Sequence, residues 1–83
     1  MKVHVIVYCT CDSKEPFLFN AAQEIKDDTT VKKMVTAALQ AASSDMAFDD
    51  ILSDTDKEII AEANHFIKTV KLTNRISLQV NIE

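Results

Sequence analysis

The chain has 83 residues, of which 47% are hydrophobic and 27% charged, and its formal net charge at pH 7 is −4. This length allows one domain, residues 1–83, and the composition is too hydrophobic for a disordered chain. There is no glycine, which excludes a phosphate-binding P-loop, a dinucleotide-binding turn and a C-terminal diglycine tail.

The cellular compartment follows from what the sequence lacks. No apolar run approaches the roughly 18–20 residues of a membrane-spanning helix, and no signal-peptide cleavage pattern follows Met1. Cys9 and Cys11 are separated by a single residue, so they cannot link distant segments as the disulfides of secreted scaffolds do. We therefore expect a cytoplasmic protein with free thiols that does not associate with membranes.

Residues 2–11 have the period of two that is typical of a strand. The residues predicted to share one face are Val3, Val5, Val7, Cys9 and Cys11. The opposite face is half apolar, with Ile6 and Tyr8, so we expect this strand to be central in its sheet. A turn over residues 12–16 follows and contains the only proline.

Residues 17–26 are ambiguous. The spacing of Phe17, Phe19, Ala21 and Ile25 favours a strand, whereas the run from Ala21 to Glu24 is typical of a helix. We favour a strand that forms a hairpin with the first one, because the segment begins with aromatic residues after a turn.

The next segment predicts a helix over residues 30–43. Asp27, Asp28, Thr29 and Thr30 provide capping oxygens and negative charge at its start. The apolar residues that recur at helical spacing are Val31, Met34, Val35, Ala38, Leu39 and Ala42.

A connector over residues 43–53 contains an apolar trio, Phe48, Ile51 and Leu52, that favours a short helical turn. Thr55 and Glu58 then have the spacing of a capping box and predict the start of a second helix. The apolar side of this predicted helix consists of Ile59, Ile60, Ala63, Phe66 and Ile67, with His65 in its last turn.

Residues 70–82 alternate between apolar and polar side chains, which predicts a strand. Because one strand of this length is unusual, a hairpin near Asn74 is the alternative to a long bent strand. A three-residue loop would place Leu72 opposite Ile76 and Val70 opposite Leu78, whereas a two-residue turn would mix the two faces.

The elements define an α+β fold with the order β-β-α-α-β and a C-terminal hairpin as an option. We expect a small mixed β-sheet with two helices on one face. The apolar spacing of Ile25, Val31, Met34 and Ala38 also resembles the strand-to-helix junction of ubiquitin-like β-grasp domains. That resemblance implies a topology and no function.

The candidate chemical sites are weak. Cys9 and Cys11, with His4 and Asp12 nearby, lack the second ligand pair of a zinc site, and neighbouring valines argue against a reactive thiol. A calcium loop starting at Asp54 would need glycine and glutamate where the chain has Ile59 and His65. We therefore expect no enzyme activity, no metal and no cofactor.

The acidic segment, residues 45–62, departs most from an average composition, with seven carboxylates against Lys57 and a net charge of −6. Such a surface disfavours direct nucleic-acid binding and suits a basic protein partner. We therefore predict a non-enzymatic protein-binding module, such as an inhibitor or regulator of a basic, nucleic-acid-binding protein. The candidate partner-binding residues are Asp45, Asp49, Asp50, Asp54, Asp56, Glu58 and Glu62.

Two other functions stay open at this point. The first is a structural or assembly subunit that forms a homodimer or larger assembly through its β-sheet. The second, which the sequence favours least, is a thiol or metal protein that uses Cys9 and Cys11.

Overall fold

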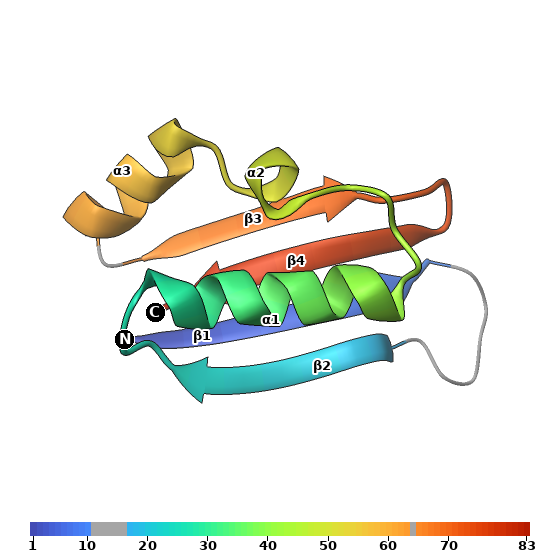
Figure 1. Cartoon of the computed structure of the whole chain (residues 1–83), viewed down its shortest axis with the longest axis horizontal. Coiled ribbons are helices and arrows are strands. Elements are labelled where there is room, and N and C mark those ends of the chain that lie inside the picture. The colour runs from blue at the N-terminus through green and yellow to red at the C-terminus, as the bar shows by residue number, and fades with distance from the viewer. Residues whose placement is uncertain (11–16, 64) are drawn as a thin grey trace.

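The structure, a computed structural model, describes residues 1–10, 17–63 and 65–83. Seven elements follow one another in these ranges, and Figure 1 shows their arrangement. They are β1 (Lys2–Cys9), β2 (Phe17–Glu24), α1 (Asp28–Ala41), α2 (Phe48–Ile51), α3 (Asp54–Ala63), β3 (Phe66–Lys71) and β4 (Ile76–Ile82). The α+β class predicted from the sequence is confirmed.

The four strands form one sheet in the order β2-β1-β4-β3. All three strand pairs are antiparallel, whereas the sequence had led us to expect a mixed sheet. β1 pairs with β2 on one side and with β4 on the other, so the prediction that the first strand is central is confirmed.

The helices pack on one face of this sheet, as predicted (Figure 1). α1 lies over β1 and β2, α3 packs beside β3, and the short α2 contacts α1. The buried core between these layers consists of Val3, Val5, Val7, Val31, Met34, Val35, Ala38, Leu39, Ile51, Leu52, Phe66, Leu78, Val80 and Ile82. No helix in the described ranges is both long enough and apolar enough to cross a membrane.

The opposite face of the sheet carries the alternate side chains of each strand. His4, Ile6 and Tyr8 of β1 lie on this face and are half-buried by their neighbours in the sheet. The Nε2 atom of His4 is hydrogen-bonded to the side-chain oxygen of Asn20. The side-chain oxygen of Asn81, which lies opposite His4, is buried without a hydrogen-bond partner.

The ambiguous segment after the first turn is a strand, as we favoured. β2 runs antiparallel to β1, with Ala21 opposite Val5 and Phe19 opposite Val7. Its register shifts between Val7 and Tyr8, which marks a bulge near the start of β2. The pairing ends where the Ile25 N–H donates to the Met1 carbonyl at 2.8 Å.

The predicted central helix is present but begins and ends two residues earlier, at Asp28 and Ala41. The side chain of Asp27 is its N-cap and accepts a hydrogen bond from the Thr30 N–H at 3.2 Å. The residues whose spacing resembles that of β-grasp domains, Ile25 to Ala38, lie in the loop after β2 and in most of α1. The sheet on which α1 packs is antiparallel throughout.

The start of the third strand was predicted wrongly. Phe66 and Ile67 belong to β3 and not to the preceding helix, and His65 is an exposed residue between the two elements. Phe66 lies opposite Ile82 and is buried, which is the position of an inward-facing strand residue. Apolar burial in the sheet therefore ends the helix at Ala63.

The C-terminal hairpin has the predicted three-residue loop, which keeps the apolar residues of its two strands opposite one another. Val70 lies opposite Leu78, and the Leu72 N–H donates to the Ile76 carbonyl at 2.9 Å. The Thr73 hydroxyl accepts hydrogen bonds from the N–H groups of Arg75 and Ile76 at 3.2 and 3.1 Å. A threonine side chain thus stabilises a turn that has no glycine.

The end of α1 has a backbone conformation that usually requires glycine. Ser43 has a φ of 51°, and its N–H donates to the Gln40 carbonyl at 3.0 Å. We expect Ser43→Gly to raise the free energy of unfolding by about 1 kcal/mol, because glycine adopts this left-handed conformation without a Cβ clash. Urea denaturation measures the change.

The matched control is Ala41→Gly, two residues earlier in the last turn of α1. This substitution places glycine in a helical position and is expected to lower the free energy of unfolding by about 0.5–1 kcal/mol. Destabilisation by both substitutions would contradict the argument from Ser43.

Candidate functional site

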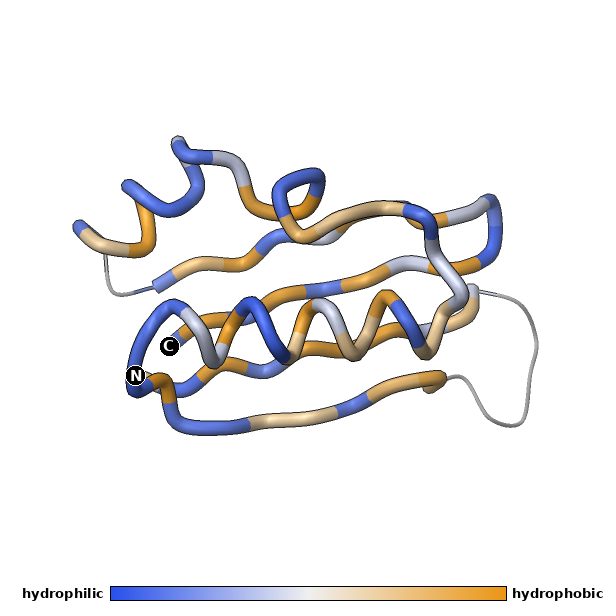
Figure 2. Tube along the Cα trace, viewed as in Figure 1, coloured by the Kyte–Doolittle hydropathy of each residue, from blue (hydrophilic) through white to orange (hydrophobic). Residues whose placement is uncertain are grey.

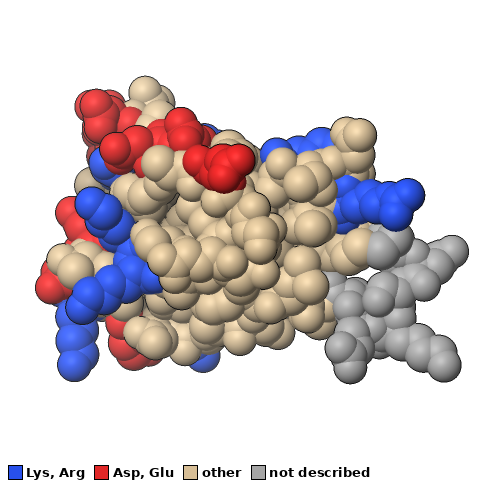
Figure 3. All heavy atoms as spheres, turned by 45° about the vertical axis from the view of Figure 1, so that its right-hand side comes forward, with Lys and Arg blue, Asp and Glu red and all other residues tan. Residues whose placement is uncertain are grey.

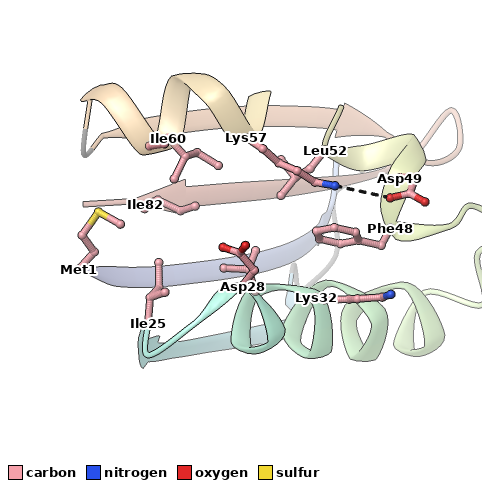
Figure 4. Close-up of a pocket in the computed structure, with 12 residues that line it drawn as sticks. Met1, Ile25, Asp28, Lys32, Phe48, Asp49, Leu52, Lys57, Ile60 and Ile82 are labelled. Atoms are coloured by element: carbon pink, nitrogen blue, oxygen red, sulfur yellow. Dashed lines mark ion pairs between the residues drawn. The ribbon is translucent and has the colours of Figure 1, made fainter. Parts of the chain in front are cut away.

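A cleft of about 400 Å³ opens between α1 and α3 (Figure 4). It lies between the two helices because α1 packs over β1 and β2 while α3 packs beside β3. Strand β4 contributes Ile82 to its floor. The apolar side chains that line it are those of Met1, Ile25, Val31, Phe48, Leu52, Ile60, Ala61 and Ile82.

Charged side chains surround the mouth of this cleft. The Lys57 ammonium lies 3.9 Å from the Asp49 carboxylate and 3.8 Å from that of Asp54, and 5.5 Å from the centre of the Phe48 ring. Lys57 therefore joins α3 to α2 at the cleft entrance (Figure 4). Asp28 and Lys32 of α1 are on the opposite side of the mouth. Because the lysine pairs are exposed, each contributes little to stability.

The structure separates the seven acidic candidates into two groups. Asp50 and Asp56 hold backbone groups at helix starts, since Asp50 accepts from the Ala47 N–H at 2.7 Å and Asp56 accepts from the Ser53 N–H at 2.9 Å. The other five are exposed to solvent in and around α2 and α3: Asp45, Asp49, Asp54, Glu58 and Glu62. Figure 3 shows acidic side chains gathered along the top of the molecule.

The start of α3 corrects the predicted capping box. Ser53, not Thr55, is the capping residue, because the Asp56 N–H donates to the Ser53 hydroxyl at 3.2 Å while the Asp56 carboxylate accepts from Ser53. Thr55 lies inside the first turn of the helix. Two overlapping sequence patterns fit the capping-box rule here, and the helix uses the earlier one.

Asp56 also forms the closest ion pair in the described part of the chain. The Lys68 ammonium of β3 donates to its carboxylate at 2.6 Å, and the Asp56 side chain is only 14% exposed. The hydrogen bond from Lys68 lowers the pKa of the Asp56 carboxyl below its ordinary value, and the Ser53 N–H adds to this effect. Asp56 therefore ties α3 to β3.

The other candidate residues from the sequence are not brought together in the described part of the structure. Cys9 is half-buried and disulfide-bonded, so the expectation of a free thiol there is wrong, and Cys11 lies outside the described residues. Asp12 also lies outside them. His4 is on the open face of the sheet and His65 is in the loop before β3. Within the described ranges, no three metal-ligating side chains lie close enough together to hold an ion.

Sequence reasoning missed the cleft and gave no role to Lys32 or Lys57 at its mouth. A signal for the cleft was present, since Ile59 and Ile60 give α3 apolar side chains on adjacent positions and only Ile60 lines the cleft. Ile59 is exposed. The partnership of Lys68 with Asp56 had no local signal, because the two residues come from different elements.

Comparison of the chain with protein-family models, with curated proteins and with solved structures finds no match.

The contribution of Asp56 to stability is testable by denaturation. We expect Asp56→Asn to lower the free energy of unfolding at pH 7 by about 1 kcal/mol, because the ion pair with Lys68 is lost and the cap is weakened. The control is Asp54→Asn, which removes the same charge from the same helical turn. The Asp54 side chain is fully exposed, so this change should stay within about 0.5 kcal/mol.

The pH dependence of the same proteins gives an independent test. A carboxyl whose pKa is lower in the folded than in the unfolded chain stabilises the fold above the unfolded pKa and loses this effect as the pH falls through the folded one. The advantage of wild type over Asp56→Asn should therefore shrink below about pH 4 in urea denaturation. An unchanged difference at pH 3 or lower would contradict the assignment.

Proposed function

We propose that this protein is a non-enzymatic binding module that engages a basic protein surface through the exposed carboxylates of α2 and α3. The observation that carries the proposal is that Asp49, 88% exposed, and Asp54, fully exposed, stand beside an apolar cleft. An apolar centre with a charged rim is the usual composition of a protein-binding surface.

The charges support a basic partner. After Asp56 is paired with Lys68, the acidic segment still carries six carboxylates against the single ammonium of Lys57. A field of this sign accelerates encounter with a positively charged surface and repels nucleic acid. Proteins that bind nucleic acid carry such basic surfaces, so inhibition or regulation of one of them is the role we propose.

The cleft gives this surface a second means of recognition. Its volume of about 400 Å³ is enough for an apolar side chain of the partner, which would be removed from water between Phe48 and Ile60. Burial of that side chain supplies affinity, whereas the surrounding acids select the charge of the partner. The two contributions respond differently to salt, because only the electrostatic one is screened.

The charge contribution is tested by affinity capture from the native cell, followed by a salt titration. The double variant Asp49→Lys/Asp54→Lys is expected to lose the basic partner that wild type retains. The control Glu83→Lys/Thr36→Lys/Ala37→Lys changes the net charge equally but at exposed positions outside the acidic segment, and should retain it. Equal loss by both variants, or retention by both, would count against the acidic surface as the interface.

The apolar contribution is tested by filling the cleft without changing any charge. Ala61 is exposed and lines the cleft, so Ala61→Trp should leave the fold intact and weaken binding of the captured partner at least about tenfold. The slope of affinity against salt should stay as in wild type. The control is Ala41→Trp at the end of α1, and binding unaffected by both substitutions would remove the cleft from the interface.

A further inference from the structure

Among the described residues, β2 and β3 are the edge strands of the sheet, and their backbone hydrogen-bonding groups can be assigned. In an antiparallel sheet, alternate residues of a strand bond to its two neighbours. Lys2 of β1 exchanges both backbone hydrogen bonds with Glu83, at 2.7 and 2.9 Å, so the even-numbered residues of β1 bond toward β4. The odd-numbered ones therefore bond toward β2.

This alternation in β1 identifies the backbone N–H and C=O groups of β2 that do not bond to β1. Val5 lies opposite Ala21, so the odd-numbered residues of β2 bond to β1. The N–H and C=O groups of Asn20, Ala22 and Glu24 then point away from the sheet. Within the described ranges, no strand pairs with this side of β2.

The same reasoning applies to β3. Leu72 donates to the carbonyl of Ile76, so the even-numbered residues of β3 bond to β4. Those whose backbone groups face outward are Ile67, Thr69 and Lys71. The two edges are therefore equivalent in backbone geometry, and they differ in side chains.

Only one of these edges has the protection that isolated edges usually carry. β3 carries the exposed Lys71, and α3 packs against it and pairs its Asp56 with Lys68. Lysines on an edge strand oppose pairing with another strand. β2 has eight residues without a lysine or arginine, and its only charge is Glu24 at its end. Figure 2 shows apolar or neutral shades over most of its length.

We propose that two copies of this chain associate through antiparallel pairing of their β2 edges and form one continuous eight-stranded sheet. The pairing is symmetric, so each β2 serves as the partner of the other about a twofold axis. Side chains that share a face must lie opposite one another, which places the axis at Asn20, Ala21 or Ala22. These residues are neutral and small enough to face their own copies.

The distribution of charge favours a second copy over another occupant. Each chain has a net charge of −4, so two copies repel unless their acidic surfaces stay apart. The acidic helix α3 lies beside β3, at the opposite side of the sheet from β2 (Figure 1). A charged partner, by contrast, would find only Glu24 on β2. The exposed side chains of Phe17 (55%) and Leu18 (46%) would be partly covered by the second copy.

The oligomeric state of the full chain tests this proposal. Sedimentation in the presence of a reductant, which removes disulfides between copies, should show a species of about twice the 9.3 kDa chain mass. Ala22→Pro removes one outward N–H per copy, and Ala22→Lys adds the protection that β3 already has. Each substitution is expected to raise the dimer dissociation constant at least about tenfold.

The controls make the same changes on the other edge. Thr69→Pro and Thr69→Lys alter the equivalent outward position of β3, on the same open face of the sheet, and should leave the dimer intact. Hydrogen exchange of wild type should protect the amides of Asn20, Ala22 and Glu24 more strongly as the concentration rises. Circular dichroism of each variant establishes that it has folded.

Three results would overturn the proposal. One is a wild-type chain that stays monomeric up to high micromolar concentration. Another is a dimer that the Thr69 substitutions dissociate, since association would then involve β3 or the open face of the sheet. The third is a dimer that survives both Ala22 substitutions with the β2 amides unprotected.

Discussion

The alternation of β1 is the constraint on which the rest of the structure depends. Its odd-numbered side chains, Val3, Val5 and Val7, are fully buried beneath the helices. Its backbone groups are used on both sides, by β2 and by β4. The alternation along β1 therefore determines which face of the sheet the helices cover and which face stays open. It also determines which backbone N–H and C=O groups of β2 point away from the sheet. A shift of one residue in β1 would exchange the core for the open face and remove the site of helix packing.

The parts of the fold that depend on local periodicity could be predicted from the sequence, and those that depend on contacts between elements could not. The alternation after Val70 was sufficient to fix the parity of the C-terminal hairpin. The start of β3 was hidden because Lys68, an inward-facing residue opposite buried Val80, interrupts the apolar pattern. That lysine is tolerated on the covered face because Asp56 of α3 neutralises it at 2.6 Å. No sequence window contains both partners in a recognisable spacing.

The same distinction between local patterns and contacts between elements applies to the candidate site. The excess of carboxylates in residues 45–62 was visible in the composition, but the different roles of these carboxylates were not. Asp50 and Asp56 hold helix starts, whereas Asp49 and Asp54 are exposed beside Lys57. The cleft depends on the separation of α1 and α3 over the sheet, which is set by packing and not by the periodicity of either helix. A protein without glycine also reaches its left-handed turn with Ser43, which no sequence rule would have selected.

The two proposed interfaces lie at opposite edges of the sheet, and this separation has a consequence for binding. A dimer joined at β2 would carry its two acidic surfaces at the two far edges of one sheet, because α3 lies beside β3 in each copy. A basic partner with two sites at a matching distance would then be bound with an effective concentration that a monomer lacks. The β2 edge contributes no charge to this recognition, and the acidic surface contributes no backbone pairing to the dimer. The two proposed contacts would therefore not compete, because each uses a different edge of the sheet and a different physical interaction.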